Sequence, residues 1–221
     1  MLRLLVVSDI HGAIAKARRL RDVSRDYTVV AGDIASCNSV EEAVSILEEL
    51  ASHGPPLVWV PGNCDSPSLL EADAPGFSIH GKAVKLGEVV FAGAGGSIYT
   101  PFGTPFEYSD EELASILEKA LSSVGDSSHL ALVVHTPPYG SGLDRVRGGE
   151  YVGSRRLREL LAKASPKPFM LATGHIHEAW GTACVEGVTA VNPGPLEAGR
   201  YALVEYDPGV KAVRVRLAKL S

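Results

Sequence analysis

Near its N-terminus the chain reads Leu4-Leu5-Val6-Val7-Ser8-Asp9-Ile10-His11, an apolar run that ends in a carboxylate and an imidazole. An uninterrupted apolar run of this length is typical of a strand that is buried on both faces. Two further runs repeat the pattern and end in polar side chains, at Val29 to Asp33 and at Val58 to Asn63. The segments between them, residues 13–25 and 39–52, carry the spacing of amphipathic helices. This alternation predicts parallel strands joined by crossover helices.

The rest of the chain adds strands of a second kind. Short strand-like runs occupy residues 77–86, 88–94, 129–135 and 169–174, and helical patterns occupy residues 109–121 and 154–164. Residues 93–106 and 137–152 are rich in glycine, proline and aromatics, so we expect surface loops there, and the second is long enough to indicate a functional loop. Four strand-like segments follow residue 181. We therefore expect one domain over residues 1–221 that contains two sheets.

Composition narrows the class of protein. The chain of 221 residues has a net charge of −5 and no Lys/Arg-rich block, which argues against a nucleic-acid partner or an anionic membrane surface. It has three cysteines and no CxxC motif, so we expect neither a disulfide framework nor a thiolate zinc site. No apolar run reaches the length of a membrane span. These features predict a cytoplasmic location, and they leave open whether the protein is a monomer or a homo-oligomer.

Seven residues of types that commonly bind metal ions in proteins lie at the ends of strand-like runs along this chain. They are Asp9, His11, Asp33, Asn63, His135, His175 and His177. Ligands gather beyond the carboxyl ends of the strands in an open α/β sheet, so we expect these side chains to meet. A carboxylate such as Asp33 can join two cations about 3.5–4 Å apart. The mixed nitrogen and oxygen set suits Mn, Fe, Ni, Co or Zn better than Mg or Ca.

Each of these residues also has a simpler interpretation when it is taken alone. Asp9 is a possible cap for a helix that begins near Gly12. Gly32-Asp33 is a common turn sequence, and His135 fits a hydrogen-bonded histidine of the core. The case for a metal site fails only if every one of these simpler interpretations is true at once. The set of residues therefore favours two divalent metal ions in a hydrolase.

In their order along the chain, the motifs resemble those of the calcineurin-like metallophosphoesterases. The matching elements are Asp9-Ile10-His11, Gly32-Asp33, Gly62-Asn63-Cys64-Asp65, His135 and Gly174-His175-Ile176-His177. The resemblance implies a four-layer α/β/β/α sandwich of two mixed sheets flanked by helices. It also implies a first metal bound by Asp9, His11 and His177 and a second bound by Asn63, His135 and His175. Asp33 would then bridge the two ions together with a water or hydroxide.

The resemblance is closest to small members of the family with phosphodiesterase activity, some of which act on cyclic nucleotides. It implies that a hydroxide bound by both metals attacks a small phosphodiester, with catalytic roles for Asp33, Asn63, Cys64 and His135. Asn63, Cys64 and Tyr139 are the expected substrate contacts. The alternatives are a phosphomonoesterase and a non-catalytic scaffold that shares the fold.

One residue departs from the common pattern of the family. Many members have a histidine where this chain has Cys64, and that histidine is thought to protonate the leaving group or to bind the phosphate. A thiol is a poorer proton donor near neutral pH than an imidazolium. We therefore expect slower turnover or a preference for esters whose leaving group needs little protonation. A small buried thiol without a catalytic role is the other interpretation of Cys64.

Overall fold

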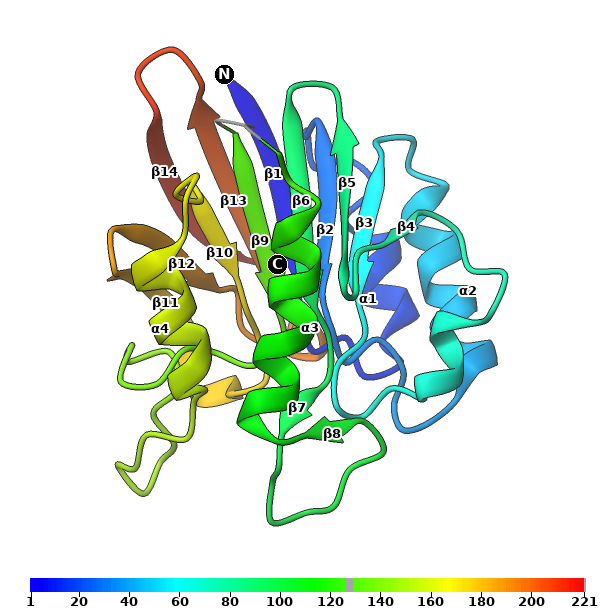
Figure 1. The fold of residues 1–221 in the computed structure, drawn as a ribbon. Helices are drawn as coiled ribbons and strands as arrows, with labels where there is room; N and C mark the ends of the chain where they lie inside the picture. Colours follow the sequence, from blue (N-terminus) through cyan, green and yellow to red (C-terminus); the bar gives the residue numbers. More distant parts are fainter. Residues whose placement is uncertain (126–128, 221) are drawn as a thin grey trace.

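The computed structural model describes residues 1–125 and 129–220 and contains two mixed sheets of six strands each (Figure 1). In order across the first sheet the strands are β14 (Ala212–Lys219), β13 (Arg200–Asp207), β1 (Leu2–Val7), β2 (Tyr27–Ala31), β3 (Leu57–Val60) and β4 (Phe77–Ser78). In the second they are β11 (Gly181–Val185), β12 (Val188–Asn192), β10 (Met170–Ala172), β9 (Leu130–Val134), β6 (Val89–Ala94) and β5 (Lys82–Leu86). A short parallel pair, β7 (Ser97–Ile98) and β8 (Glu107–Tyr108), lies apart from both.

Helices cover the outer face of each sheet. The first sheet carries α1 (Ile14–Arg18) and α2 (Val40–Ala51), and the second carries α3 (Asp110–Ser122) and α4 (Arg155–Lys163). Short 3-10 helices lie at Pro67–Leu70, His177–Ala179 and Leu196–Ala198. In the described parts of the chain, no helix is both long and apolar enough to cross a bilayer.

The helices and sheets stack in four layers, and a cluster of apolar side chains fills each of the three interfaces between them. In β1, Leu4 and Val6 face the second sheet, whereas Leu5 and Val7 face α1 and α2. Leu132 of β9 packs under α3 and α4 on the opposite side of the molecule. Successive side chains of a strand point to opposite faces, so only a continuous apolar run satisfies both. The predicted α/β/β/α sandwich is confirmed.

The first predicted helix is much shorter than expected. The amphipathic pattern indicated a helix over residues 13–25, but α1 ends at Arg18 and turns continue from there. The buried guanidinium of Arg25 donates hydrogen bonds to the carbonyl oxygens of Leu20 and Val23 at 2.8 and 2.7 Å. Arg25 thus satisfies carbonyl groups that a longer helix would have paired within its own backbone.

The start of α2 is as predicted, and Ser39 caps it. The side chain of Ser39 accepts a hydrogen bond from the Glu42 backbone N–H at 3.2 Å. The Glu42 carboxylate does not return to Ser39. It accepts instead from the backbone N–H and hydroxyl of Ser36 at 2.6 and 3.0 Å. The Ser39–Glu42 capping box is therefore only half formed, because Glu42 fastens the loop after Asp33 to the helix.

Candidate metal centre

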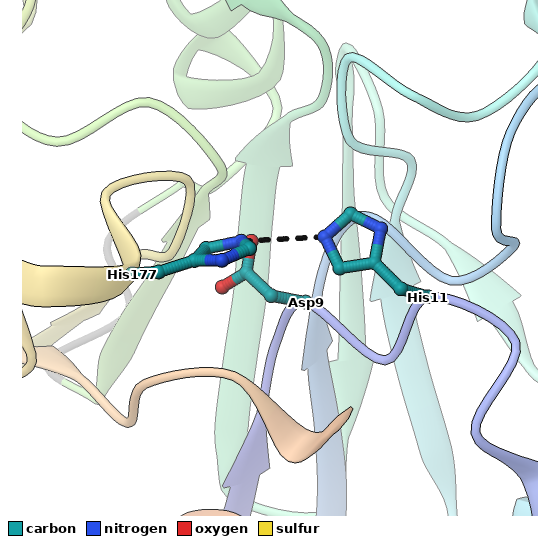
Figure 2. Close-up of side chains that lie close together, drawn as sticks. All are labelled: Asp9, His11 and His177. Carbon is teal, nitrogen blue, oxygen red and sulfur yellow. Dashed lines mark hydrogen bonds and ion pairs between the residues drawn. The ribbon is translucent and has the colours of Figure 1, made fainter. Parts of the chain in front are cut away.

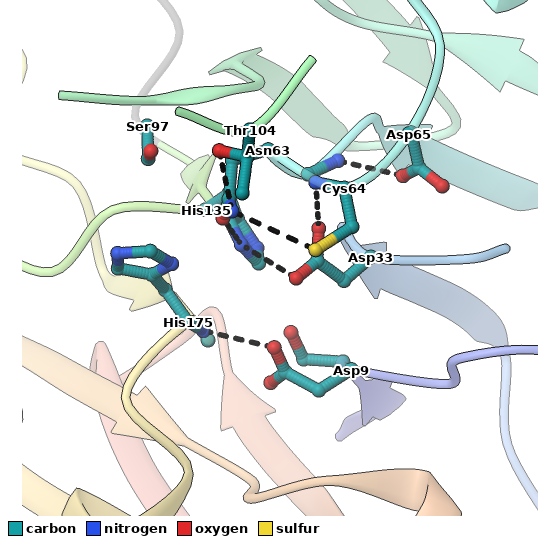
Figure 3. Close-up of polar contacts among 12 residues, drawn as sticks. Asp9, Asp33, Asn63, Cys64, Asp65, Ser97, Thr104, His135 and His175 are labelled. Atoms are coloured by element: carbon teal, nitrogen blue, oxygen red, sulfur yellow. Dashed lines mark hydrogen bonds and ion pairs between the residues drawn. The ribbon is translucent and has the colours of Figure 1, made fainter. Parts of the chain in front are cut away.

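The seven predicted ligands meet where the carboxyl ends of the central strands of both sheets come together (Figures 2 and 3). Backbone hydrogen bonds join the loops within each sheet, from Asp9 N to Gly32 O at 2.9 Å and from Gly174 N to His135 O at 3.0 Å. The His135 side chain then crosses between the sheets, with Nδ1 2.6 Å from the carbonyl oxygen of Ala31. The site thus lies on the seam between the two sheets.

Asp9, His11 and His177 form one cluster (Figure 2). The Nε2 atoms of His11 and His177 lie 3.3 Å apart, and His177 Nε2 lies 3.4 Å from Asp9 Oδ1. Donor atoms that share one ion at about 2.0–2.2 Å lie roughly 3.0–3.5 Å from one another. The three side chains are therefore spaced as ligands of a single cation would be.

The remaining ligand candidates gather around His135 (Figure 3). Its Nε2 atom lies 3.0 Å from Asn63 Oδ1 and 3.5 Å from Asp33 Oδ2, and its ring centroid is 5.2 Å from that of His175. Because Nδ1 donates to Ala31, the neutral form of His135 presents its lone pair at Nε2, toward the site. A backbone contact fixes this tautomer, as is common for histidines that bind metals.

Asp33 stands between the two groups. Its Oδ2 atom lies 3.7 Å from His11 Nε2 and 3.5 Å from His135 Nε2, while Oδ1 accepts a hydrogen bond from the Cys64 backbone N–H at 2.8 Å. One oxygen of this buried carboxylate is thus fixed by the chain, and the other faces both clusters. This is the arrangement that a carboxylate shared by two cations requires.

Four of the seven ligand candidates have left-handed backbone conformations. Asp9, His11, Asp33 and His175 have φ values of 51°, 43°, 51° and 68°. Such conformations cost about 1–3 kcal/mol each in residues other than glycine and concentrate at functional sites. The turns aim each side chain back across the ends of the strands.

Three glycines permit the turns to touch. Gly32, Gly62 and Gly174 each precede a ligand candidate, and a Cβ atom at any of them would overlap atoms of the site. At Gly32 that atom would lie 2.5 Å from His135 Nδ1. The metal centre therefore needs residues without a side chain at these three positions, which explains why the motifs read Gly-Asp, Gly-Asn and Gly-His.

Charges within the site keep the carboxylates ionised. Burial alone would raise the pKa values of Asp9 and Asp33, but the neighbouring histidines lower both below the ordinary range. Burial lowers the pKa of His175 to about 4, with a further contribution from His135, so its imidazole is neutral at pH 7. Burial lowers the pKa of His135, but the charge of Asp33 raises it to about 9. Divalent cations bind anionic carboxylates and neutral imidazoles, so a cation would displace the proton of His135.

An unpaired atom shows that the site fits a cation. Asp9 is fully buried, and its Oδ2 atom has no hydrogen-bond partner among the residues that the structure describes. Its Oδ1 atom faces His177 and accepts from the His175 backbone N–H at 3.1 Å. A buried carboxylate oxygen without a partner is costly, and a bound cation removes that cost. The simpler interpretation of Asp9 as a helix cap is wrong, because the cap residue of α1 is Ala13.

Cys64 and Asp65 lie at the edge of this cluster. The Cys64 sulfur lies within 4.8 Å of ligand atoms of His11 and Asp33. Burial raises the pKa of the Cys64 thiol, and the charge of Asp33 raises it further, so the group stays protonated in the metal-free protein. Asp65 accepts hydrogen bonds from the backbone N–H groups of Ile34, Ala35 and Gly62 at 2.7–3.1 Å. It holds two of the ligand-bearing turns together.

The aromatic residues of the two long loops differ in position. Phe106 is buried against His80 and Tyr108, whereas Tyr99 and Phe102 are 69% and 82% exposed. Tyr139 lies under the guanidinium of Arg155, 3.6 Å from ring centroid to Cζ. A substrate contact by Tyr139 stays a prediction, and one face of its ring is already taken.

Two contributors to the site carried no clear signal in the sequence. Asn192 is fully buried and donates to the carbonyl oxygen of Ile176 at 2.9 Å, which fixes the loop between His175 and His177. Asn192-Pro193-Gly194 is a sequence common in tight turns of any protein. Thr104 accepts a hydrogen bond from Asn63 Nδ2 at 3.0 Å, from within the loop rich in glycine, proline and aromatics, where no sequence feature singled out this threonine.

Comparisons with known proteins point to one family. Residues 2–207 match the model of the calcineurin-like phosphoesterase superfamily domain. The uncharacterized protein MJ1162 of Methanocaldococcus jannaschii is 33% identical over 198 residues, which are 88% of each chain. The crystal structure of TT1561 from Thermus thermophilus superimposes with a TM-score of 0.73 at 18% identity, over 97% of this chain and 98% of that one.

A second solved structure has the same fold. Phosphopantetheinyl hydrolase (PptH) from Mycobacterium tuberculosis superimposes with a TM-score of 0.64 at 15% identity, over 86% of this chain and 88% of that one. The family match extends over nearly the whole chain and includes all seven ligand candidates. The chain belongs to the calcineurin-like phosphoesterase superfamily, and it is a metal-dependent phosphoester hydrolase.

Proposed function

We propose that the protein hydrolyses a small phosphodiester at a centre of two divalent cations. The observation that carries this proposal is the position of Asp33 Oδ2, 3.7 Å from His11 Nε2 and 3.5 Å from His135 Nε2. In the proposed assignment Asp33 serves both cations. The first is completed by Asp9, His11 and His177, and the second by Asn63, His135 and His175.

The charges of the ligands determine the net charge of such a centre and therefore the kind of substrate that it attracts. When bound, two divalent cations lower the pKa of a shared water and polarise the phosphoryl oxygens. Asp9 and Asp33 contribute two negative charges against four positive ones, while Asn63 and the four histidines are neutral in their ligand forms. The centre therefore stays positive and attracts an anionic ester. Imidazole and carboxylate donors together favour Mn, Fe, Ni, Co or Zn.

Cys64 bears on which esters are the better substrates. Asp33 and burial hold its pKa above the ordinary range, so the thiol is a weak proton donor to a departing alkoxide. Substrates with a leaving group of low basicity suffer least from this. The similarity in fold to a phosphopantetheinyl hydrolase supports a small phosphate ester as the substrate. Cyclic nucleotides are members of the proposed substrate class.

The test compares hydrolysis of bis(p-nitrophenyl) phosphate with that of p-nitrophenyl phosphate, after removal of metal with EDTA and addition of Mn, Ni, Co, Zn or Mg. We expect metal-restored cleavage of the diester, two metal ions per chain by elemental analysis, and loss of activity in His135→Ala. Preference for the monoester would replace the proposal with a phosphomonoesterase. A single bound ion in the active protein would refute the dinuclear centre.

A further inference from the structure

The connection between β7 and β8 lies over Asn63 and is bonded to it twice. The backbone N–H of Phe106 donates to the Asn63 carbonyl oxygen at 3.0 Å, and Asn63 Nδ2 donates to Thr104 Oγ1 at 3.0 Å. Thr104 Oγ1 in turn donates to Glu107 Oε1. A chain of side-chain hydrogen bonds thus runs from the loop to a residue of the metal centre (Figure 3 shows its Asn63–Thr104 end).

An asparagine ligand has an orientation problem that a carboxylate ligand does not have. The two ends of its amide have nearly the same shape, but only the oxygen has a lone pair for a cation. The amide oxygen of Asn63 faces His135 Nε2 at 3.0 Å. A cation bound to that nitrogen leaves it no proton to give to Asn63. His135 therefore cannot hold the amide in the productive orientation once metal is present.

Glu107 fixes the polarity of the hydrogen bonds. Its carboxylate accepts from the Thr104 backbone N–H at 2.8 Å, from the Thr100 N–H at 3.2 Å and from the Thr100 hydroxyl at 2.6 Å, besides the Thr104 hydroxyl. Burial alone would raise the pKa of Glu107, but these hydrogen bonds lower it to about 2. An ionised carboxylate only accepts, so the Thr104 hydroxyl must give its proton to Glu107.

The direction of the next bond follows. With its proton committed to Glu107, Thr104 Oγ1 can only accept from Asn63, and only the NH₂ end of the amide can donate to it. We propose that Glu107 and Thr104 are positioning residues that hold the Asn63 amide with its oxygen toward the cation. The inference rests on the proposed function only in taking Asn63 as a ligand.

We call the hydrogen-bonded series Glu107, Thr104 and Asn63 the relay. Loss of the relay should lower the affinity for cations, because partners that orient a metal ligand are typically worth about 10–100-fold in affinity. The experiment measures binding of Mn²⁺ and Co²⁺ to EDTA-stripped protein by competition with a chromophoric chelator. We expect Thr104→Val to weaken binding about 10–100-fold and Thr104→Ser, which keeps the hydroxyl, to stay within about 3-fold of the wild type. Thr100→Val is the matched control, since Thr100 bonds the same carboxylate without touching Asn63.

A double-substitution cycle separates orientation from general loosening of the loop. In Asn63→Asp both ends of the side chain are oxygens, so there is no wrong orientation to exclude. Thr104→Val should therefore have an effect of less than about 2-fold when it is combined with Asn63→Asp. An equal loss of affinity in both backgrounds would overturn the relay. So would an unchanged affinity of Thr104→Val in the wild-type background.

Two further variants keep the result interpretable. Should Thr104→Val fail to fold by circular dichroism, Glu107→Gln tests the same relay, because its NH₂ group can donate to Thr104 and free that hydroxyl to turn toward Asn63. The expected loss is again about 10-fold or more, and wild-type affinity would overturn the relay. Asn63→Ala tests the ligand assignment itself, and wild-type cation affinity in this variant would overturn the assignment. Weakened binding in Asn63→Ala together with wild-type affinity in Thr104→Val would overturn the relay alone.

Discussion

Gly62 lies so close to Asp33 that a Cβ atom at residue 62 would overlap the carboxylate Oδ1 and the backbone nitrogen of Asp33. The two residues belong to turns that follow neighbouring strands, β2 and β3. Close packing of the turns brings Asn63 and Asp33 to the same histidine, with His135 Nε2 3.0 Å from Asn63 Oδ1 and 3.5 Å from Asp33 Oδ2. Glycine at this position is a requirement for space rather than for an unusual backbone angle.

Gly62→Ala should therefore damage the metal centre directly. Relief of the overlap requires Asp33 to move, so we expect the variant to lose measurable Mn²⁺ binding and about 1–3 kcal/mol of unfolding free energy. Gly181→Ala is the matched control, because its Cβ atom would meet Leu143 Cδ2 at an ordinary 3.7 Å. Metal titration and urea denaturation of both variants check this prediction, and equal behaviour of the two would contradict it.

His80 should make the protein sensitive to acid. Its Nδ1 atom accepts a hydrogen bond from the Gly95 backbone N–H at 2.9 Å, and burial lowers its pKa to about 4, with smaller contributions from Lys82 and Lys119. An unfolded histidine titrates near ~6.5, so the folded state binds fewer protons between these values. The stability that neutral His80 contributes is complete above pH 6.5 and is lost as the pH falls toward 4.

The size of the His80 effect follows from the same two pKa values, and it is about 2–3 kcal/mol between pH 7 and 4. His80→Gln keeps an acceptor for Gly95 but has no titration. Urea denaturation at several pH values should therefore show a shallower acid slope for the variant than for the wild type. Identical slopes would mean that His80 does not govern acid stability.

Asn192 should control the affinity for metal without touching it. Its amide donates to the carbonyl oxygens of Gly174 and Ile176 at 3.4 and 2.9 Å and accepts from the Gly194 N–H at 2.9 Å. Asn192→Asp has nearly the same shape but turns an oxygen toward those two carbonyl groups. We expect it to lower cation affinity about 10–100-fold and to do so more than Asn192→Ala. Chelator competition on the stripped proteins measures the order, and a milder effect of the aspartate would be inconsistent with this contact.

Cys64→His should change how the rate depends on the leaving group. A well-placed general acid is worth about 10²–10⁴-fold, and an imidazolium donates its proton far more readily than a thiol of raised pKa. For aryl phosphodiesters with basic leaving groups we expect gains of about 10-fold or more, with little change for p-nitrophenolate. Cys184→His, at an exposed position of β11, is the control. A gain that is independent of the leaving group would argue against general acid catalysis.

Much of the fold could be predicted because both faces of the central strands are buried. The run from Leu4 to Val7 must be apolar throughout, and the ligand at its end must lie at the edge where parallel strands finish. The same logic located the ends of β2, β3, β9 and β10. The order of the motifs supplied the ligand candidates, and the structure brings all seven together.

Other features depend on partners that are distant in the sequence. Residues 77–86 have the pattern of short strands with a turn at Gly81, and the structure places the two parts in different sheets: β4 pairs with β3 in the first sheet, while β5 pairs with β6 in the second. Nothing local indicates which sheet each of these two strands joins, because that choice is set by tertiary contacts. The role of Thr104 has the same origin: its hydroxyl is informative only once the loop has placed it between Asn63 and Glu107.

The strand order of the first sheet has a consequence for how the protein is made. β1 lies between β2 and β13, so that Leu4 pairs with Tyr27 on one side and with Val204 on the other. A ribosome that has released residues 1–177 has delivered every proposed ligand, yet β1 still has an open edge, and the Ser8 carbonyl still awaits the Leu196 N–H that bonds it at 2.9 Å. Pairings this distant in sequence form late. The proposed ligands of a growing chain are thus all present before the strand that carries Asp9 has both of its neighbours, and the β13–β14 hairpin supplies the second one.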